Sequence, residues 1–164
     1  MDRDVVETAF RFVESINRQE VEKLTDMMTD SHRFVDLSGE EHVGRAVMRK
    51  GWLDYFRMCP DYLIHVCEFH HRGDRVYLIG RTTGSHLDLP WREEFQDTVI
   101  WIADVEGERL SLWKVVADTP ETRQAYGIPG QSHPEAPRSP GQQIQCRALW
   151  PNPMISCDPC SRYN

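Results

Sequence analysis

The sequence lacks the features that identify membrane, nucleotide-binding and nucleic-acid-binding proteins. No apolar run approaches the roughly 18 residues that a membrane-spanning helix needs. There is no Gly-rich phosphate loop and no nucleophile elbow, which argues against nucleotide-dependent and serine-hydrolase chemistry. The formal net charge is −7 and no basic stripe is present, so the surface should repel phosphate backbones. We therefore expect neither a membrane nor a nucleic acid as a partner.

The sequence also gives little support for disulfides. There are five cysteines, an odd number, and the start Met1-Asp2-Arg3-Asp4 lacks the apolar core of a signal peptide. We accordingly expect a cytoplasmic protein without a disulfide framework. The pair in Cys157-Asp158-Pro159-Cys160 has no second pair at zinc-finger spacing, and we interpret it as two thiols without a role.

What is present predicts one globular domain that begins with helices. The chain has 164 residues, of which 40% are hydrophobic and 27% are charged, values typical of a globular protein with a real core. Apolar residues recur at a spacing of three to four and predict helices over Asp4–Asn17, Val21–Met28 and Val47–Phe56. The third helix should end at the Cys59-Pro60 step, because the residue before a proline disfavours helix.

After Pro60 the apolar period changes to two, which indicates strands. The pattern predicts four of them, over Tyr62–His71, Arg75–His86, Glu93–Val105 and Leu110–Asp118. Short Gly-containing turns between consecutive strands favour antiparallel hairpins. Helices first and an antiparallel sheet afterwards make an α+β fold.

The composition changes at Pro129. Seven of the ten prolines lie from there to the end, with Gly, Ser and Gln between them and little periodicity. We therefore predict a folded domain over residues 1–128 and a Pro-rich, irregular or disordered tail over residues 129–164.

Two stretches resemble known enzymes. Phe10-Arg11-Phe12-Val13-Glu14-Ser15-Ile16-Asn17, followed by Phe34-Val35-Asp36-Leu37-Ser38-Gly39, is similar to the start of ketosteroid isomerases. Thr83-Gly84-Ser85-His86, followed by Trp113 to Asp118, is similar to SnoaL-like polyketide cyclases. Both belong to the nuclear transport factor 2-like superfamily. The resemblance implies a cone-shaped α+β fold, in which three N-terminal helices pack on a curved antiparallel sheet and enclose a pocket.

The resemblance also implies roles for three carboxylates. Asp36 matches the general base of the isomerases, Asp97 lies near their oxyanion-binding acid, and Asp118 falls near the base of the cyclases. One departure is informative. Where the isomerases have an oxyanion-binding Tyr on the first helix, this chain has Phe12, and a phenyl ring cannot donate that hydrogen bond.

The residues themselves support proton-transfer chemistry but leave alternatives open. A carboxylate in an apolar pocket gains a raised pKa, and two carboxylates in different environments can divide into a base and a neutral acid. Such a pair suits proton abstraction beside a carbonyl. Alternatively, Asp36 hydrogen-bonds the turn at Ser38-Gly39. Asp97 could likewise pair with an arginine such as Arg81 or Arg92.

Histidines and aromatics complete the predicted site. His86, in the cyclase-like run, is the best candidate for a pocket histidine that transfers protons. His70 and His71 flank a predicted hairpin turn and should be exposed, so we expect no metal site, and we expect no cofactor. Large aromatic side chains line both cores and ligand sites. The predicted pocket walls are Phe12, Trp52, Phe56 and Trp101.

These observations leave two hypotheses for function. The first is a cofactor-independent isomerase, cyclase or dehydratase that acts on a small, mostly apolar carbonyl compound with Asp36 or Asp118 as base. The alternative is a non-catalytic, dimeric scaffold of the same fold that binds a ligand or another protein. In a pure scaffold, side chains such as Phe12, Trp52 and Trp101 should fill the cavity.

Overall fold

The structure is a computed structural model that describes residues 2–130. Its helices are α1 (Asp2–Asn17), α2 (Val21–Asp26), α3 (Arg45–Met58), α4 (Trp91–Glu94) and α5 (Pro120–Tyr126). Its strands are β1 (Met28–Val35), β2 (Glu41–Val43), β3 (Leu63–Arg72), β4 (Arg75–Thr83), β5 (Val99–Glu106) and β6 (Arg109–Ala117). Of the predicted Pro-rich tail, only residues 129 and 130 are among the described residues, and the cysteine pair lies outside them. Within residues 2–130, no helix combines the length and the apolar character needed to cross a membrane.

The strands form one sheet in the order β2-β1-β6-β5-β4-β3. All neighbouring strands are antiparallel except β1 and β6, which are parallel. The α+β class, with helices first and a mostly antiparallel sheet afterwards, is thus confirmed. A parallel pair needs a long connection, and β2, α3, β3, β4 and β5 all lie between β1 and β6 in the chain.

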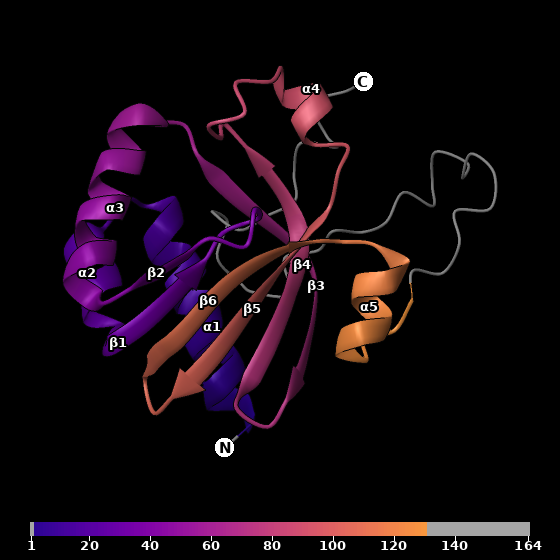
Figure 1. The fold of residues 1–164 in the computed structure, drawn as a ribbon, viewed down its shortest axis with the longest axis horizontal. Coiled ribbons are helices and arrows are strands. Elements are labelled where there is room, and N and C mark those ends of the chain that lie inside the picture. Colours follow the sequence, from indigo (N-terminus) through magenta and orange to yellow (C-terminus); the bar gives the residue numbers. More distant parts are fainter. Residues whose placement is uncertain (1, 131–164) are drawn as a thin grey trace.

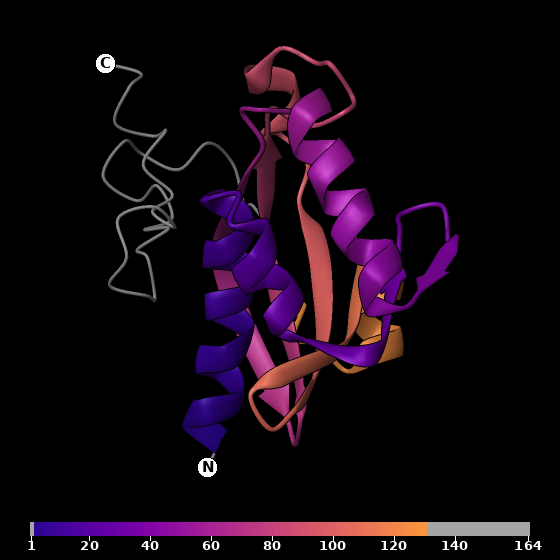
Figure 2. The same ribbon diagram turned by 90° about the vertical axis from the view of Figure 1, so that its left-hand side faces the viewer.

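The sheet curves around α1, which lies across its inner face (Figures 1 and 2). Helix α1 is held there by its apolar stripe, in which Ala9, Phe12, Val13 and Ile16 are buried. Its last residue, Asn17, exchanges two hydrogen bonds with the backbone of Ile64 on β3, at 3.0 and 2.8 Å. These contacts fix the helix against the sheet and form the base of the main core.

A bulge bends β3 and β4. The register between these strands shifts between Val66 and Glu68, and Gly80 lies opposite this point. A Cβ atom on Gly80 would lie 1.9 Å from the carbonyl oxygen of His65, so only glycine allows this close approach. Beyond the bend, the upper end of β4 leads into the segment 84–98, which lies at the same end of the molecule as the C-terminal end of α3 (Figure 1). We call this end the wide end of the cone.

The predicted strand Glu93–Val105 is wrong at its start. Residues 91–94 form the short helix α4, and β5 begins only at Val99. The strand predicted to reach His86 also ends early, at Thr83. Pro90 and the acidic residues Glu93 and Glu94 are typical of a helix start, and they overrode the apolar alternation there. The elements β2, α4 and α5 were not predicted, because each is too short to show a period.

The outer face of the sheet carries a second apolar cluster, which includes Tyr77, Ile79, Ile100 and Ile102. Helix α5 and the residues after it lie on this side, opposite α1 (Figure 2). Tyr126 and Ile128 pack against the cluster. The sheet thus separates a large inner core from a smaller outer one.

Candidate functional site

A row of aromatic side chains runs along the inner side of α3 at the wide end. We call Phe34, Trp52, Tyr55 and Tyr62 the aromatic row. Ring centroids lie 6.3 Å apart for Phe34 and Trp52, 6.0 Å for Trp52 and Tyr55, and 5.1 Å for Tyr55 and Tyr62. The row connects the end of β1 to the start of β3. Its flat, apolar surfaces are typical of the walls of a site for a planar ligand.

Trp52 has an unsatisfied polar atom inside this row. Only 7% of its surface is exposed, and its Nε1–H finds no hydrogen-bond acceptor among the described residues. A buried donor without a partner costs roughly 1–3 kcal/mol. A ligand oxygen at this position would satisfy it.

Asp36 lies at the β1 end of the row and accepts hydrogen bonds from its own turn. Its Oδ1 accepts from the backbone N–H and the hydroxyl of Ser38, at 2.9 and 2.5 Å, and from the N–H of Glu40 at 3.0 Å. The side chain is 32% exposed. These bonds, led by that of the Ser38 hydroxyl, lower the pKa of Asp36. The contacts are those of the turn-capping alternative, and the role of Asp36 as base stays a prediction.

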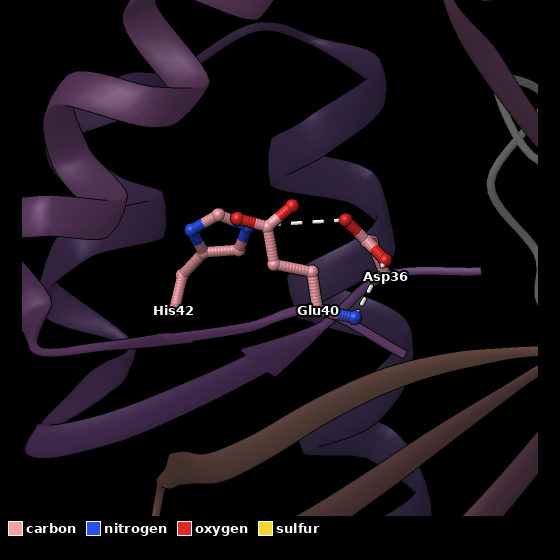
Figure 3. A group of neighbouring side chains, drawn as sticks. All are labelled: Asp36, Glu40 and His42. Atoms are coloured by element: carbon pink, nitrogen blue, oxygen red, sulfur yellow. Dashed lines mark hydrogen bonds and ion pairs between the residues drawn. The ribbon is translucent and has the colours of Figure 1, made fainter. Parts of the chain in front are cut away.

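Figure 3 shows Asp36 together with Glu40 and His42. Oδ2 of Asp36 lies 3.9 Å from Nε2 of His42. Each of the three residues offers one possible ligand atom, and these three atoms lie within 4.8 Å of one another. His42 also stacks on Phe34, with centroids 5.9 Å apart. The group could offer three ligands to a cation, but it is open to solvent and no buried donor points into it.

The opposite end of the row is joined to the segment after β4. The hydroxyl of Tyr55 lies 3.0 Å from Nδ1 of His86 and accepts from the His86 N–H at 3.3 Å. His86 was predicted on a strand facing a pocket, but it lies in an exposed turn beyond β4. Burial is the main cause of the raised pKa of Tyr55, so this residue is a neutral phenol that can donate a hydrogen bond.

Glu94 is a buried carboxylate at the wide end that the sequence analysis missed. Only 5% of its surface is exposed. Its Oε1 accepts from the Thr82 hydroxyl at 2.8 Å and from the Ser85 N–H at 3.2 Å. The incorrect strand over Glu93–Val105 concealed it. The sequence signal that could have found it is the helix start at Pro90.

The other two predicted carboxylates do not reach the row. Asp97 lies exposed in the loop before β5, so its predicted place within the strand Glu93–Val105 is wrong. The side chain of Asp118 is 1% exposed and faces α5, where Nε and Nη2 of Arg123 donate to it at 2.6 and 3.0 Å. The Thr98 hydroxyl donates to Asp118 at 2.7 Å. Asp118 thus belongs to an ion pair on the outer side of the sheet.

The four predicted pocket walls are all buried but form two groups. Trp52 and Phe56 lie on α3, with centroids 5.4 Å apart. Phe12 and Trp101 lie deeper, where Phe12 is 5.0 Å and Trp101 is 6.4 Å from Trp113. Whether these side chains contact a ligand stays a prediction.

His32 is a second buried polar residue that the sequence analysis missed. It is fully buried on β1, beside Phe12, with its Nδ1 2.7 Å from the carbonyl oxygen of Leu110. A carbonyl only accepts, so Nδ1 carries the proton. Burial lowers the pKa of His32, so the ring is neutral. Its Nε2 finds no partner among the described residues. His32 and Phe34 are two residues apart on one strand and therefore lie on the same face, which could have indicated that His32 points inward.

The hollows found among the described residues lie on the surface. One is on the outer side of α3 and is lined by Ala46, Val47, Lys50, Gly51 and Asp54. The other lies between α1 and the β5–β6 turn. Neither is lined by the aromatic row, whose rings pack against one another.

Comparison with known proteins identifies relatives of this arrangement. A family model described as the SnoaL-like domain matches residues 9–113. No curated protein matches the chain. Among solved structures, one from Sinorhizobium meliloti, provisionally described as a polyketide cyclase, is 14% identical, with a TM-score of 0.56 over 68% of this chain and 93% of that one.

Two further structures are similar at the same level. One from Kribbella flavida, provisionally described as a ketosteroid isomerase, is 15% identical, with a TM-score of 0.56 over 84% of this chain and 91% of that one. A nuclear transport factor 2-like protein of unknown function from Cytophaga hutchinsonii is 11% identical, with a TM-score of 0.55 over 74% and 94%. At these identities the likeness establishes a common fold and nothing about the reaction.

Proposed function

We propose that this chain, which belongs to the SnoaL-like domain family, binds a small, mostly apolar carbonyl compound along the aromatic row and abstracts a proton beside the carbonyl. The family model matches more than half of the chain. The proposed reaction is that of a cofactor-independent isomerase, cyclase or dehydratase. Structures provisionally described as such enzymes share the fold, which supports the class of reaction by analogy alone.

The unsatisfied Nε1–H of Trp52 carries this proposal. An indole N–H only donates, so its ligand partner must be an acceptor. A carbonyl oxygen flanked by an apolar body satisfies both the donor and the surrounding rings. The same hydrogen bond strengthens when negative charge develops on that oxygen, which is the stabilisation that enolate formation requires. Trp52 could therefore supply the donor that is lost where the isomerases have Tyr and this chain has Phe12.

The proposed route by which a ligand reaches the aromatic row passes the segment 84–98, which closes the wide end. Large apolar side chains are exposed on that segment and at the end of α3: Met58, Leu87, Leu89 and Trp91. Exposed apolar groups around a closed site are typical of an entrance for apolar ligands. We propose that the segment 84–98 moves away from Tyr55 when a ligand enters.

Two measurements on the full chain test this function. Progesterone, 1-tetralone and 2-tetralone are first screened by thermal shift, in which a ligand at about 100 times its Kd adds roughly 2.7 kcal/mol of stability. Trp52→Phe should weaken binding about tenfold, whereas Tyr126→Phe, on the outer face of the sheet, should leave it unchanged. Exchange of the protons beside the carbonyl of 2-tetralone for deuterium in D2O then reports proton abstraction directly. Absence of both binding and exchange would refute the proposal.

A second candidate function is a non-catalytic scaffold. The observation that favours it is the filling of the inner core, where Phe12, Trp52 and Trp101 are all buried and line neither of the two surface hollows described above. In this case the chain should form a stable homodimer by sedimentation, and no compound in the panel should raise its melting temperature.

A further inference from the structure

Glu94 has the burial and the position expected of a base. It lies on α4, in the segment that closes the wide end, and its side chain reaches back to the end of β4. The Thr82 hydroxyl and the Ser85 N–H hold Oε1, whereas Oε2 has only one long contact, 3.4 Å from the Ser85 N–H. One oxygen is therefore fixed while the other keeps free lone pairs.

No cation neutralises Glu94 within the part of the chain that the structure describes. The ion pairs of arginine and lysine there are all with other carboxylates, and none includes Glu94. Burying a carboxylate without a cation is unfavourable, because desolvation opposes the charge. Buried carboxylates that lack a cation concentrate at functional sites.

Glu94 also lies near the Tyr55 end of the aromatic row, because the Ser85 N–H donates to Glu94 and the next residue, His86, is hydrogen-bonded to the Tyr55 hydroxyl. After burial, which is the main cause, its negative charge contributes to the raised pKa values of Tyr55 and Tyr62. It contributes in the same way to the raised pKa of the Cys59 thiol at the end of α3. Its charge thus acts on the groups that line one end of the row.

None of the three aspartates combines these properties. Asp36 is partly exposed and has a lowered pKa, which makes it a weaker base. Asp97 is exposed, and Asp118 is bound to Arg123 on the other side of the sheet. Of these four carboxylates, Glu94 alone is at once buried, outside the ion pairs of the described residues and beside the row.

We propose that Glu94 is the catalytic base for carbonyl compounds bound at the aromatic row. This inference rests on the proposed function and names the residue that performs it. Oε2 takes a proton from the carbon beside the carbonyl, so that the C–H bond breaks and an O–H bond forms. The electron pair moves to the carbonyl oxygen, which becomes an enolate held by Nε1–H of Trp52. Return of the proton to carbon restores the carboxylate and completes the cycle.

Deuterium exchange of 2-tetralone tests this assignment in the full chain. We expect Glu94→Gln to reduce the exchange rate at least 100-fold, because general-base catalysis is typically worth that much or more. Gln can still accept from Thr82 and Ser85, so the fold should persist. Glu93→Gln, at the exposed neighbour, should change the rate less than twofold, and Asp36→Asn should also leave most of it.

A second variant keeps the base but changes its surroundings. Thr82→Val removes the hydroxyl that fixes Oε1 of Glu94 while the carboxylate itself stays, so the exchange rate should fall about tenfold, the equivalent of one lost hydrogen bond. This result tests the inference if Glu94→Gln does not fold. Exchange that survives in Glu94→Gln, or an exchange rate that Thr82→Val leaves unchanged, would overturn the inference while the proposed function stands. No exchange by the unmodified protein would overturn both.

Discussion

At the scale of the residue, the buried imidazole of His32 predicts a pH dependence of stability. Its folded pKa is lowered, whereas in the unfolded chain it should take up a proton near pH 6.5. The unfolded state therefore binds more protons below that pH, and the free energy of unfolding falls as the pH falls. Between pH 7 and pH 5 the free energy of unfolding should fall by up to about 2 kcal/mol more for the unmodified protein than for His32→Phe. Urea unfolding at both pH values measures this, and equal losses would contradict it.

The sequence indicated which side chains are buried better than it indicated their partners. Alternation and helical spacing placed Phe12, Trp52 and Trp101 correctly inside. A carboxylate's partner, however, depends on which distant elements meet. Asp118 was predictable as a carboxylate after a strand, but its pairing with Arg123 depends on α5 folding back. Glu94 was missed because a local pattern suggested the wrong element.

The structural role of Asp36 in its turn can be tested separately from its predicted role as a base. Asp36→Ala removes the acceptor of three hydrogen bonds and should lower the free energy of unfolding by about 1 kcal/mol. Asp36→Asn keeps an acceptor oxygen and should lose less than half as much. Urea unfolding of the two variants is the measurement. Equal stability of Asp36→Ala and the unmodified protein would show that the turn does not need this carboxylate.

At the scale of the element, the two short helices α4 and α5 determine which side chains the long helices and strands enclose. Helices α1 and α3 and strands β3 to β6 follow from periodicity, so the sequence predicted them. Helices α4 and α5 have four and seven residues and owe their positions to single side chains. The short helix α5 begins at the Thr119 cap and Pro120, and is held by Arg123. Such contacts leave no periodic trace in the sequence.

The ion pair that holds α5 should be far stronger than an exposed pair of the same geometry. The Arg123–Asp118 and Arg75–Asp104 pairs are both bidentate, with a shortest distance of 2.6 Å in each. The first is 4% and 1% exposed, whereas the second is 39% and 31% exposed. Arg123→Ala strands a buried carboxylate and should cost about 3–5 kcal/mol. Arg75→Ala should cost about 1 kcal/mol or less. Equal costs in urea unfolding would contradict the importance of burial here.

The hydrogen bonds between Tyr55 and His86 should keep the segment 84–98 closed. Tyr55→Phe removes both bonds while preserving the ring contacts of the row. Hydrogen exchange should then become faster at the amide of His86, with protection in β5 and β6 unchanged. Tyr126→Phe, on the outer face, serves as the control and should leave the segment unaffected. Unchanged exchange at His86 would mean that other contacts close the wide end.

At the scale of the whole molecule, the aromatic row is closed at the wide end by the segment 84–98. Side-chain hydrogen bonds hold this segment in place. The cone and its α+β order were predictable, because the resemblance and the change of period agree. The closed state of the row was not predictable, because it depends on how rings from α3, β1 and β3 pack. The central claim is that this interior opens to bind a carbonyl oxygen at Trp52.

The most direct test follows the indole N–H signal of Trp52 by NMR. The 15N-labelled full chain is titrated with the compound that gives the largest thermal shift, and the signal is assigned with Trp52→Phe. Formation of a hydrogen bond from Nε1–H to the carbonyl should move this proton signal to lower field, with saturation at the same concentration as the thermal shift. Binding that leaves the Trp52 signal unchanged would contradict the account.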